Sequence, residues 1–257
     1  MACSSSSTSS LVGEWEELPP ELTPSILGRL STVDLLKAQM VCRSWRSISK
    51  DPSMWRKIES VNLAFHSEEM WRRAIDLSDD GLVEISIDLT HWGENILAYM
   101  ADRSSRLRSL TLTSTDFFLR EQFVEAVKSV KVVGQSCPNL KTLKQNCFQC
   151  LVFTDDDEIA LAIAETMPGL RHLSGNGLSN TGLNATLDTC PHLEHLDLRN
   201  CFNIHLYGNL EKRCLERIKF LRRPNDDPSE IDPSEDLSEK RFDDVTSDED
   251  DTLMMNV

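Results

Sequence analysis

Apolar residues in the first sixty positions recur at the spacing of short helices. Thr23 and Pro24 have the residue types favoured at an N-cap and at the first helical position. Ile26, Leu27 and Leu30 then follow at helical spacing. The pattern predicts a first short helix that begins at this Thr-Pro pair.

Two further helices and one helical turn are predicted before residue 60. Ser31 and Asp34 stand three residues apart, a variant of the capping box, and the helix that they start runs to about Val41. Residues 43–48 form the third helix. After a break at the Asp-Pro pair of positions 51 and 52, a last helical turn is expected to hold Met54, Trp55 and Ile58.

From about residue 80 to residue 222 the apolar pattern L-x-x-L-x-L occurs six times. The six cores are Leu82-Ile85-Ile87, Leu107-Leu110-Leu112, Leu140-Leu143-Gln145, Leu170-Leu173-Gly175, Leu193-Leu196-Leu198 and Leu215-Ile218-Phe220. Their starts are 25, 33, 30, 23 and 22 residues apart, and four of these gaps lie near or within the period of leucine-rich repeats, about 20 to 29 residues. The clearest unit adds Cys201 three residues after its last leucine.

Helical segments are expected between the cores. Three stripes share a helix face: Ile159, Ile163 and Met167; Leu183, Leu187 and Cys190; and Leu206, Leu210 and Cys214. Each unit is therefore a strand followed by a helix, and its apolar edge is covered only when a neighbouring unit stacks on it. The prediction is an α/β solenoid of parallel strands with outer helices.

Charge separates the C-terminal segment from the rest of the chain. The net charge is −15, and residues 224–257 hold thirteen acidic residues against Lys240 and Arg241, a charge of −11. This segment and the serine-rich stretch 1–13 are predicted to be disordered, because they offer little to bury. The acidic balance excludes nucleic acid as a partner, and no apolar run is long enough to span a membrane.

The candidate metal and catalytic residues form no recognisable site. Cys147 and Cys150 make a single C-x-x-C without a second pair, and His192 and His195 flank a repeat strand. We therefore predict no metal, no cofactor and no catalytic residue. Without a secretory signal the chain is expected to be intracellular, in the nucleus or the cytoplasm, with its eight cysteines reduced and mostly buried.

The N-terminal part resembles the F-box. The resemblance rests on Leu18-Pro19-Pro20-Glu21-Leu22, Ile26-Leu27, Leu30, Asp34-Leu35-Leu36, Val41-Cys42-Arg43-Ser44-Trp45-Arg46 and Asp51-Pro52 with Met54-Trp55. With the repeats, the whole resembles a plant F-box/leucine-rich-repeat protein of the cysteine-containing repeat type. The stretches Cys137-Pro138-Asn139-Leu140 and Cys190-Pro191-His192-Leu193 look like that subtype's junction between units.

The resemblance implies an α + α/β fold in five parts: a tail at 1–13, an F-box at 14–60, a linker helix at 61–79, leucine-rich repeats at 80–223 and an acidic tail at 224–257. It implies a non-catalytic substrate receptor of an SCF (Skp–cullin–F-box) ubiquitin ligase. The F-box would bind the Skp-type adaptor, and through it a cullin. The candidate adaptor-binding surface, or its immediate support, is Leu18, Pro19, Ile26, Leu27, Leu30, Leu35, Leu36, Val41 and Trp45.

The repeats would bind a protein substrate on the strand face that alternates with the buried positions. The candidate substrate-binding residues are Glu84, Asp88, Thr111, Thr142, Lys144, His172, His195, Asp197, Arg199, Arg217 and Lys219. A further hypothesis places the acidic tail across the basic residues that precede it, where it would screen them from substrates. Those residues are Arg213, Arg217, Lys219, Arg222 and Arg223.

Two alternatives to a working receptor stay open. One is an interaction scaffold that binds the Skp-type adaptor outside a ligase. The other is an eroded receptor with impaired substrate binding, because Gln145 and Gly175 replace the third apolar anchor in successive units and one gap reaches 33 residues.

Overall fold

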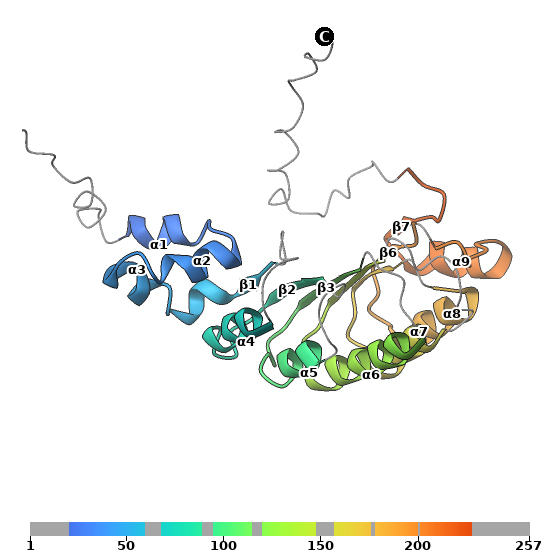
Figure 1. Cartoon of the computed structure of the whole chain (residues 1–257). Coiled ribbons are helices and arrows are strands. Elements are labelled where there is room, and N and C mark those ends of the chain that lie inside the picture. Colours follow the sequence, from blue (N-terminus) through green and yellow to red (C-terminus); the bar gives the residue numbers. More distant parts are fainter. Residues whose placement is uncertain are drawn as a thin grey trace, which may run out of the picture. The chain divides into compact units, whose positions relative to one another are not determined.

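A computed structural model describes residues 21–59, 68–88, 95–114, 120–147, 157–175, 178–199 and 201–227. The N-terminal part holds three short helices, α1 (Leu22–Leu27), α2 (Thr32–Ala38) and α3 (Arg43–Ile48), followed by a 3₁₀ turn, η1 (Pro52–Trp55). Strand β1 (Lys57–Ile58) comes next and begins a sheet (Figure 1).

The predicted cap is confirmed for α2, whereas the first helix starts earlier than predicted. The Ser31 hydroxyl accepts from the Asp34 backbone N–H at the start of α2, and α3 has the predicted bounds, with the Cys42 sulfur accepting from the Trp45 N–H. The predicted Thr23–Pro24 start of α1 is wrong, because the helix begins two residues before the proline. Pro24 is tolerated there, since the first-turn N–H groups of a helix have no partner within the helix.

The predicted last helical turn is also shorter than expected. Met54 and Trp55 belong to η1, but Ile58 lies in β1 and is fully buried. Lys57 and Ile58 pair in parallel with Glu84 and Ile85. The last residues of the N-terminal part therefore supply the first strand of the repeat sheet.

The repeats continue this sheet one strand at a time. The strands are β2 (Glu84–Asp88), β3 (Ser109–Ser114), β4 (Thr142–Cys147), β5 (His172–Gly175), β6 (His195–Asp197) and β7 (Phe220–Arg222). The helices are α4 (Glu68–Leu77), α5 (Asn95–Ala101), α6 (Arg120–Ser136), α7 (Glu158–Thr166), α8 (Asn180–Thr189) and α9 (Gly208–Arg217). The seven described strands are parallel and follow chain order, and the helices lie along one side of them (Figure 1). The predicted solenoid is confirmed.

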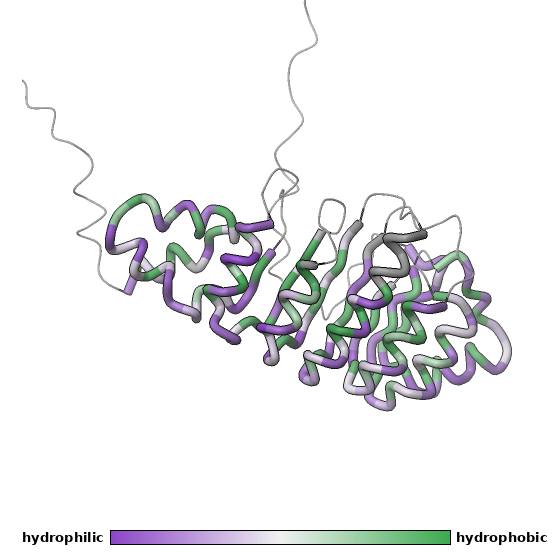
Figure 2. Tube along the Cα trace, turned by 60° about the horizontal axis from the view of Figure 1, so that its bottom comes forward, coloured by the Kyte–Doolittle hydropathy of each residue, from purple (hydrophilic) through white to green (hydrophobic). Residues whose placement is uncertain are grey.

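The leucine pattern sets the register between neighbouring strands. Leu110 pairs with Leu143 and Leu143 with Leu173, and all three are buried between the sheet and the helices. Figure 2 shows hydrophobic stretches recurring in both strands and helices along the array. Burying these stacked anchors is what stabilises units that cannot fold alone.

The two replaced anchors lie side by side. Gln145 pairs with Gly175, and a Cβ atom on Gly175 would stand 3.4 Å from the Gln145 side-chain oxygen. The missing side chain of the glycine therefore makes room for the glutamine. The register continues through both units, and the sheet is not interrupted where the pattern departs from leucine.

The register predicted for the sixth core is wrong by three residues. Leu196 pairs with Leu221, so the anchors of the last unit are Ile218 and Leu221. Leu215 lies on α9 and Phe220 on the other face of the sheet, and both are exposed. The helix of this unit extends to Arg217, which displaces the strand toward the C-terminus.

A ladder of backbone hydrogen bonds joins the units where the chain enters each strand. The Arg56 carbonyl accepts from two successive N–H groups of the next unit, and so does the Val83 carbonyl. The same pairing recurs at Arg108, Lys141 and Arg171, with bond lengths of 2.8 to 3.1 Å. Because these bonds repeat, the segments that lead into the strands are held at fixed spacing.

The helix stripes predicted from the sequence face this core. Ile163 and Met167, Leu183 with Leu187 and Cys190, and Leu210 with Cys214 are buried, while Ile159 and Leu206 are half-buried against them. All the elements above belong to one compact unit that ends at Asn225. No helix among the described residues is long and apolar enough to cross a membrane.

Four of the described cysteines are buried thiols, as predicted, and burial changes their chemistry. It raises the pKa of Cys201 from 9.0 to about 12, and that of Cys137 to about 11. The thiolate is the nucleophile in alkylation. We expect native Cys201 to react with iodoacetamide at pH 8 on the order of a thousandfold more slowly than after urea unfolding. Peptide mass spectrometry measures the two rates, and similar rates would contradict its burial.

Candidate functional site

The predicted adaptor-binding residues divide by exposure. Ile26 is 38% exposed and Val41 63%, while Leu27 and Leu35 are 0% and 3% exposed and lie in the core. Leu30, Leu36 and Trp45 are partly buried and pack against that core. Leu18 and Pro19 lie outside the described residues. The described set therefore contains two exposed side chains, three that are partly buried and two that are buried beneath them.

Two exposed apolar residues were missed by the sequence analysis. Leu22 at the start of α1 is 47% exposed, and Met40 in the turn after α2 is 75% exposed. With Ile26 and Val41 they form what we name the F-box apolar set, four residues from α1 and from the turn after α2. Large apolar side chains left in water on a small module are typical of a binding surface.

A buried tryptophan holds the two sides of this module together. Trp55 in η1 is fully buried, and its indole N–H donates to the Ser49 carbonyl at 2.8 Å, just after α3. The Glu59 N–H donates to the Thr32 hydroxyl at 2.9 Å, which ties the segment after β1 back to α2. These contacts fix the helices that carry the F-box apolar set relative to the first strand.

The second candidate site is the open face of the sheet, opposite the helices. One row of register partners runs across six strands: Glu84, Ser109, Thr142, His172, His195 and Phe220. The next row runs through Ser86, Thr111, Lys144, Ser174, Asp197 and Arg222. The side chains described in both rows are half-exposed or exposed, in contrast to the buried anchors between them. The predicted residue Asp88 is the last residue of β2.

The two ends of the open face differ in chemistry. At the first end, burial lowers the pKa of Lys57, but Glu59 and Glu84 outweigh it, so the pKa is raised. At the other end the rings of His172 and His195 stack with centroids 4.0 Å apart, and His195 stacks on Phe220 at 4.4 Å. The face passes from ion-paired carboxylates to an aromatic ladder that no sequence motif predicted.

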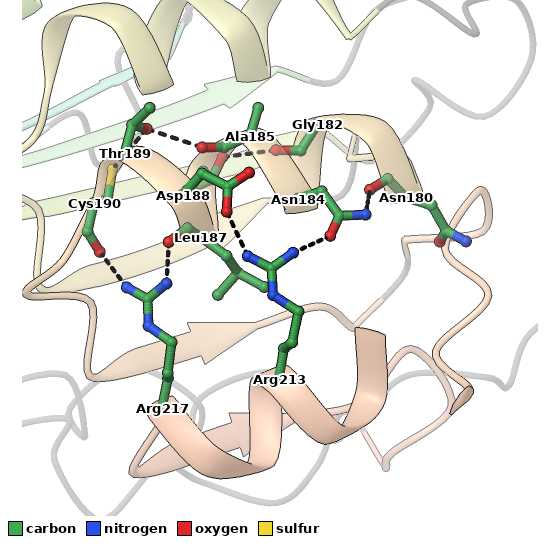
Figure 3. A network of polar contacts seen from close by, with 11 residues as sticks. Asn180, Gly182, Asn184, Ala185, Leu187, Asp188, Thr189, Cys190, Arg213 and Arg217 are labelled. Carbon is green, nitrogen blue, oxygen red and sulfur yellow. Dashed lines mark hydrogen bonds and ion pairs between the residues drawn. The ribbon is translucent and has the colours of Figure 1, made fainter. Parts of the chain in front are cut away.

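Three predicted substrate-binding cations are already engaged by the protein itself. The Arg199 guanidinium donates to both Asp197 oxygens, at 2.6 to 3.0 Å. Lys219 pairs with Glu194 at 3.2 Å, and its hydrogen bond lowers the pKa of that carboxyl. The placement of Arg217 on the strand face is corrected, because it ends α9 and donates to the carbonyls of Leu187 and Cys190 (Figure 3).

Most of the basic residues before the acidic tail have partners within the repeats. Figure 3 shows Arg213 beside Arg217, reaching from α9 to Asn184 and Asp188 on α8. Arg223 pairs with Glu211 at 3.3 Å. The contacts of Arg213 and Arg217 hold the last unit onto its neighbour, whereas the Arg223 ion pair lies within the last unit. The hypothesis that the acidic tail covers these residues stays a prediction, because residues 228–257 lie outside the described part of the chain.

No group of three His, Cys, Asp or Glu side chains that could hold a metal occurs among the residues that the structure describes. Cys147 ends β4, while Cys150 lies outside those residues.

Comparison with known proteins identifies both parts. The family model described as F-box-like matches residues 15–59. F-box protein SKIP19 of Arabidopsis thaliana is 49% identical over 278 aligned residues, 95% of this chain and 90% of that protein. F-box/LRR-repeat protein 22 of the same plant is 49% identical over 82% of this chain and 77% of its own length.

The chain belongs to the plant F-box/leucine-rich-repeat proteins. The resemblance seen in the sequence is confirmed, as is a fold with a helical F-box followed by a parallel-strand repeat array. Proteins of this family are typically non-catalytic subunits, and the relatives support a role among SCF-type substrate receptors.

Proposed function

We propose that this protein is the substrate-recognition subunit of an SCF-type ubiquitin ligase. The observation that carries the proposal is the F-box match at 15–59 together with the exposed F-box apolar set. The Skp-type adaptor covers Leu22, Ile26, Met40 and Val41, and through the adaptor the chain joins a cullin. Burying these side chains against a partner helix supplies the binding free energy.

The receptor contributes proximity rather than acid–base chemistry. The substrate binds on the open face of the repeat sheet, where Thr111, Thr142 and Lys144 lie between the carboxylate end and the His172–His195 stack. A bound substrate presents its lysines at high effective concentration to the ubiquitin-carrying enzyme. Fixed strand spacing of about 4.8 Å keeps these side chains in register for an extended segment.

The test is a pull-down of the Skp-type adaptor and cullin by the full chain and by the double variant Ile26→Asp, Val41→Asp. We expect adaptor affinity to fall by a factor of ten or more, because two carboxylates must lose water in an apolar contact. Leu35 is unsuitable as a target, since it is buried and an aspartate there would unfold the module.

A matched control changes two exposed apolar residues elsewhere. Val132 on α6 and Leu161 on α7 are exposed, and the variant Val132→Asp, Leu161→Asp adds the same charge outside the F-box. Circular dichroism first establishes that both variants are folded. Equal capture by both variants and the wild type would refute the F-box apolar set as the adaptor surface. Capture of the adaptor without the cullin would favour the scaffold alternative.

A further inference from the structure

A groove lies at the end of the sheet where the chain enters the first four strands, β1 to β4. Its volume is about 530 Å³, within the range of ligand-binding clefts, and it is lined by residues from four successive units. Pro52, Ser53 and Arg56 come from the F-box, and the rest come from the segments that precede β2, β3 and β4. The groove belongs neither to the F-box apolar set nor to the open face of the sheet.

Three arginines dominate its charge. Arg56, Arg106 and Arg108 all line the groove and are exposed. None of the three side chains forms an ion pair or hydrogen bond within the described part of the chain, in contrast to Arg213 and Arg217 on α9. Arginine side chains without a partner inside the protein remain available to bind an anion from outside it.

The acidic residues nearby cancel only part of this charge, since one carboxylate, that of Asp79, lines the groove beside three arginines. Asp79 lines the groove, but its neighbour Asp80 is committed to Ser105, whose N–H and hydroxyl it accepts at 2.7 and 2.8 Å. Lys141, in the next unit after Arg108, is exposed and adds a further cation at the same end of the sheet. The groove is therefore a cationic site on a chain whose net charge is −15.

The floor of the groove is rigid, while its arginine side chains can adapt. The carbonyls of Arg56 and Arg108 each accept two N–H groups of the following unit, and the Asn139 amide donates to the Ser105 carbonyl at 3.1 Å. The guanidinium groups thus start from backbone positions that are fixed by the strand spacing. Planar guanidinium groups bind carboxylate or phosphate oxygens in pairs, which suits a ligand with several anionic side chains.

We propose that this groove binds an acidic peptide segment of the substrate, with Arg56, Arg106 and Arg108 as its anion-binding residues. The inference rests on the proposed receptor function, because it names the substrate class. Charge complementarity selects the occupant: an extended peptide carries an acidic side chain every few ångströms, which matches cations placed on successive strands. Arg108 directly precedes Ser109 of the open face, so one extended substrate can reach from the groove onto that face.

The experiment measures fluorescence anisotropy of short labelled peptides with the full chain in low salt. One peptide alternates Glu and Ser, a second replaces Glu by Gln, and a third carries phosphoserine. We expect the acidic peptide to bind, the Gln peptide not to bind, and the triple variant Arg56→Gln, Arg106→Gln, Arg108→Gln to bind the acidic peptide at least about tenfold more weakly.

The matched control removes three exposed cations outside the groove. Arg29, Arg43 and Lys50 are exposed in the F-box, and their replacement by Gln changes the net charge by the same amount. An equal loss in this variant would overturn the proposal, since the effect would then come from net charge alone. Tighter binding of an RNA oligonucleotide than of either anionic peptide would also overturn it.

The assay separates this inference from the proposed function because it needs no adaptor. Adaptor capture without acidic-peptide binding refutes the groove and leaves the receptor function standing. Groove-dependent peptide binding without adaptor capture supports the groove as an anion-binding site and refutes the proposed receptor function. Stronger binding of the phosphoserine peptide than of the Glu peptide, lost in the groove variant, supports the groove and assigns phosphate as its preferred anion.

Discussion

Replacing Trp55 by alanine is expected to lower the free energy of unfolding by about 3 to 5 kcal/mol. Trp55 is the largest fully buried side chain that the structure describes, and it lies between the F-box helices and the first strand. Its removal leaves a cavity at the start of the sheet and deprives the Ser49 carbonyl of its 2.8 Å hydrogen bond. Urea unfolding followed by far-ultraviolet circular dichroism measures the change.

Two further variants separate the effect of the cavity from that of the lost hydrogen bond and from aromatic truncation in general. Trp55→Phe keeps most of the apolar volume but removes the indole N–H, and we expect a loss of about 1 to 3 kcal/mol. Phe202→Ala truncates an exposed aromatic side chain, and we expect a change within about 0.5 kcal/mol. A loss for Trp55→Ala as small as that for Phe202→Ala would show that the junction between F-box and repeats is not packed as described.

The sequence predicted the elements of the fold better than the exposure of their side chains. Ser31 and Asp34 define a cap from local chemistry alone, so the start of α2 was predicted correctly, although the helix ends at Ala38 and not at about Val41. The bounds of α3 were also predicted correctly. Leu27, Leu35 and Ile26 have similar local patterns, yet only Ile26 is exposed. Exposure depends on what packs from other elements, and a pattern along one helix does not contain that information.

The errors at the two ends of the array have a common cause. Ile58 was predicted in a helical turn and the last unit was aligned three residues too early. Both segments lie where a neighbouring strand, and not local spacing, decides the conformation. The internal units have neighbours of similar sequence on both sides, and their repeated pattern therefore reported the register correctly.

The sequence contains a partial signal for the arginine groove, because one of its three arginines, Arg108, belongs to a repeated basic position. The second position of L-x-x-L-x-L holds Val83, Arg108, Lys141, Arg171, Glu194 and, after the register correction, Lys219. Four of these six residues are basic, and they lie where the chain enters the strands. Which of them stay unpaired could not be predicted, because Glu194 neutralises Arg171 and Lys219 through contacts between units.

Replacing Gly182 by valine is expected to destabilise the protein by about 3 kcal/mol, although glycine is itself unfavourable inside a helix. Gly182 is buried on α8 where it meets α7. A Cβ atom there would lie 2.5 Å from the Ala160 Cβ and 2.6 Å from an Asp157 carboxylate oxygen. That carboxylate cannot simply turn away, because it accepts the Ser179 hydroxyl at 2.7 Å.

Two substitutions isolate this contact from general effects on the helix. Thr181→Val places the same side chain one residue earlier at an exposed position, and Gly169→Ala adds a Cβ that meets nothing closer than 3.7 Å. Both should change the free energy of unfolding by less than about 1 kcal/mol. Thermal and urea unfolding measure all three proteins. If Gly182→Val lost no more stability than Thr181→Val, the packing of α7 on α8 could not be the close approach that fixes the spacing of the repeats.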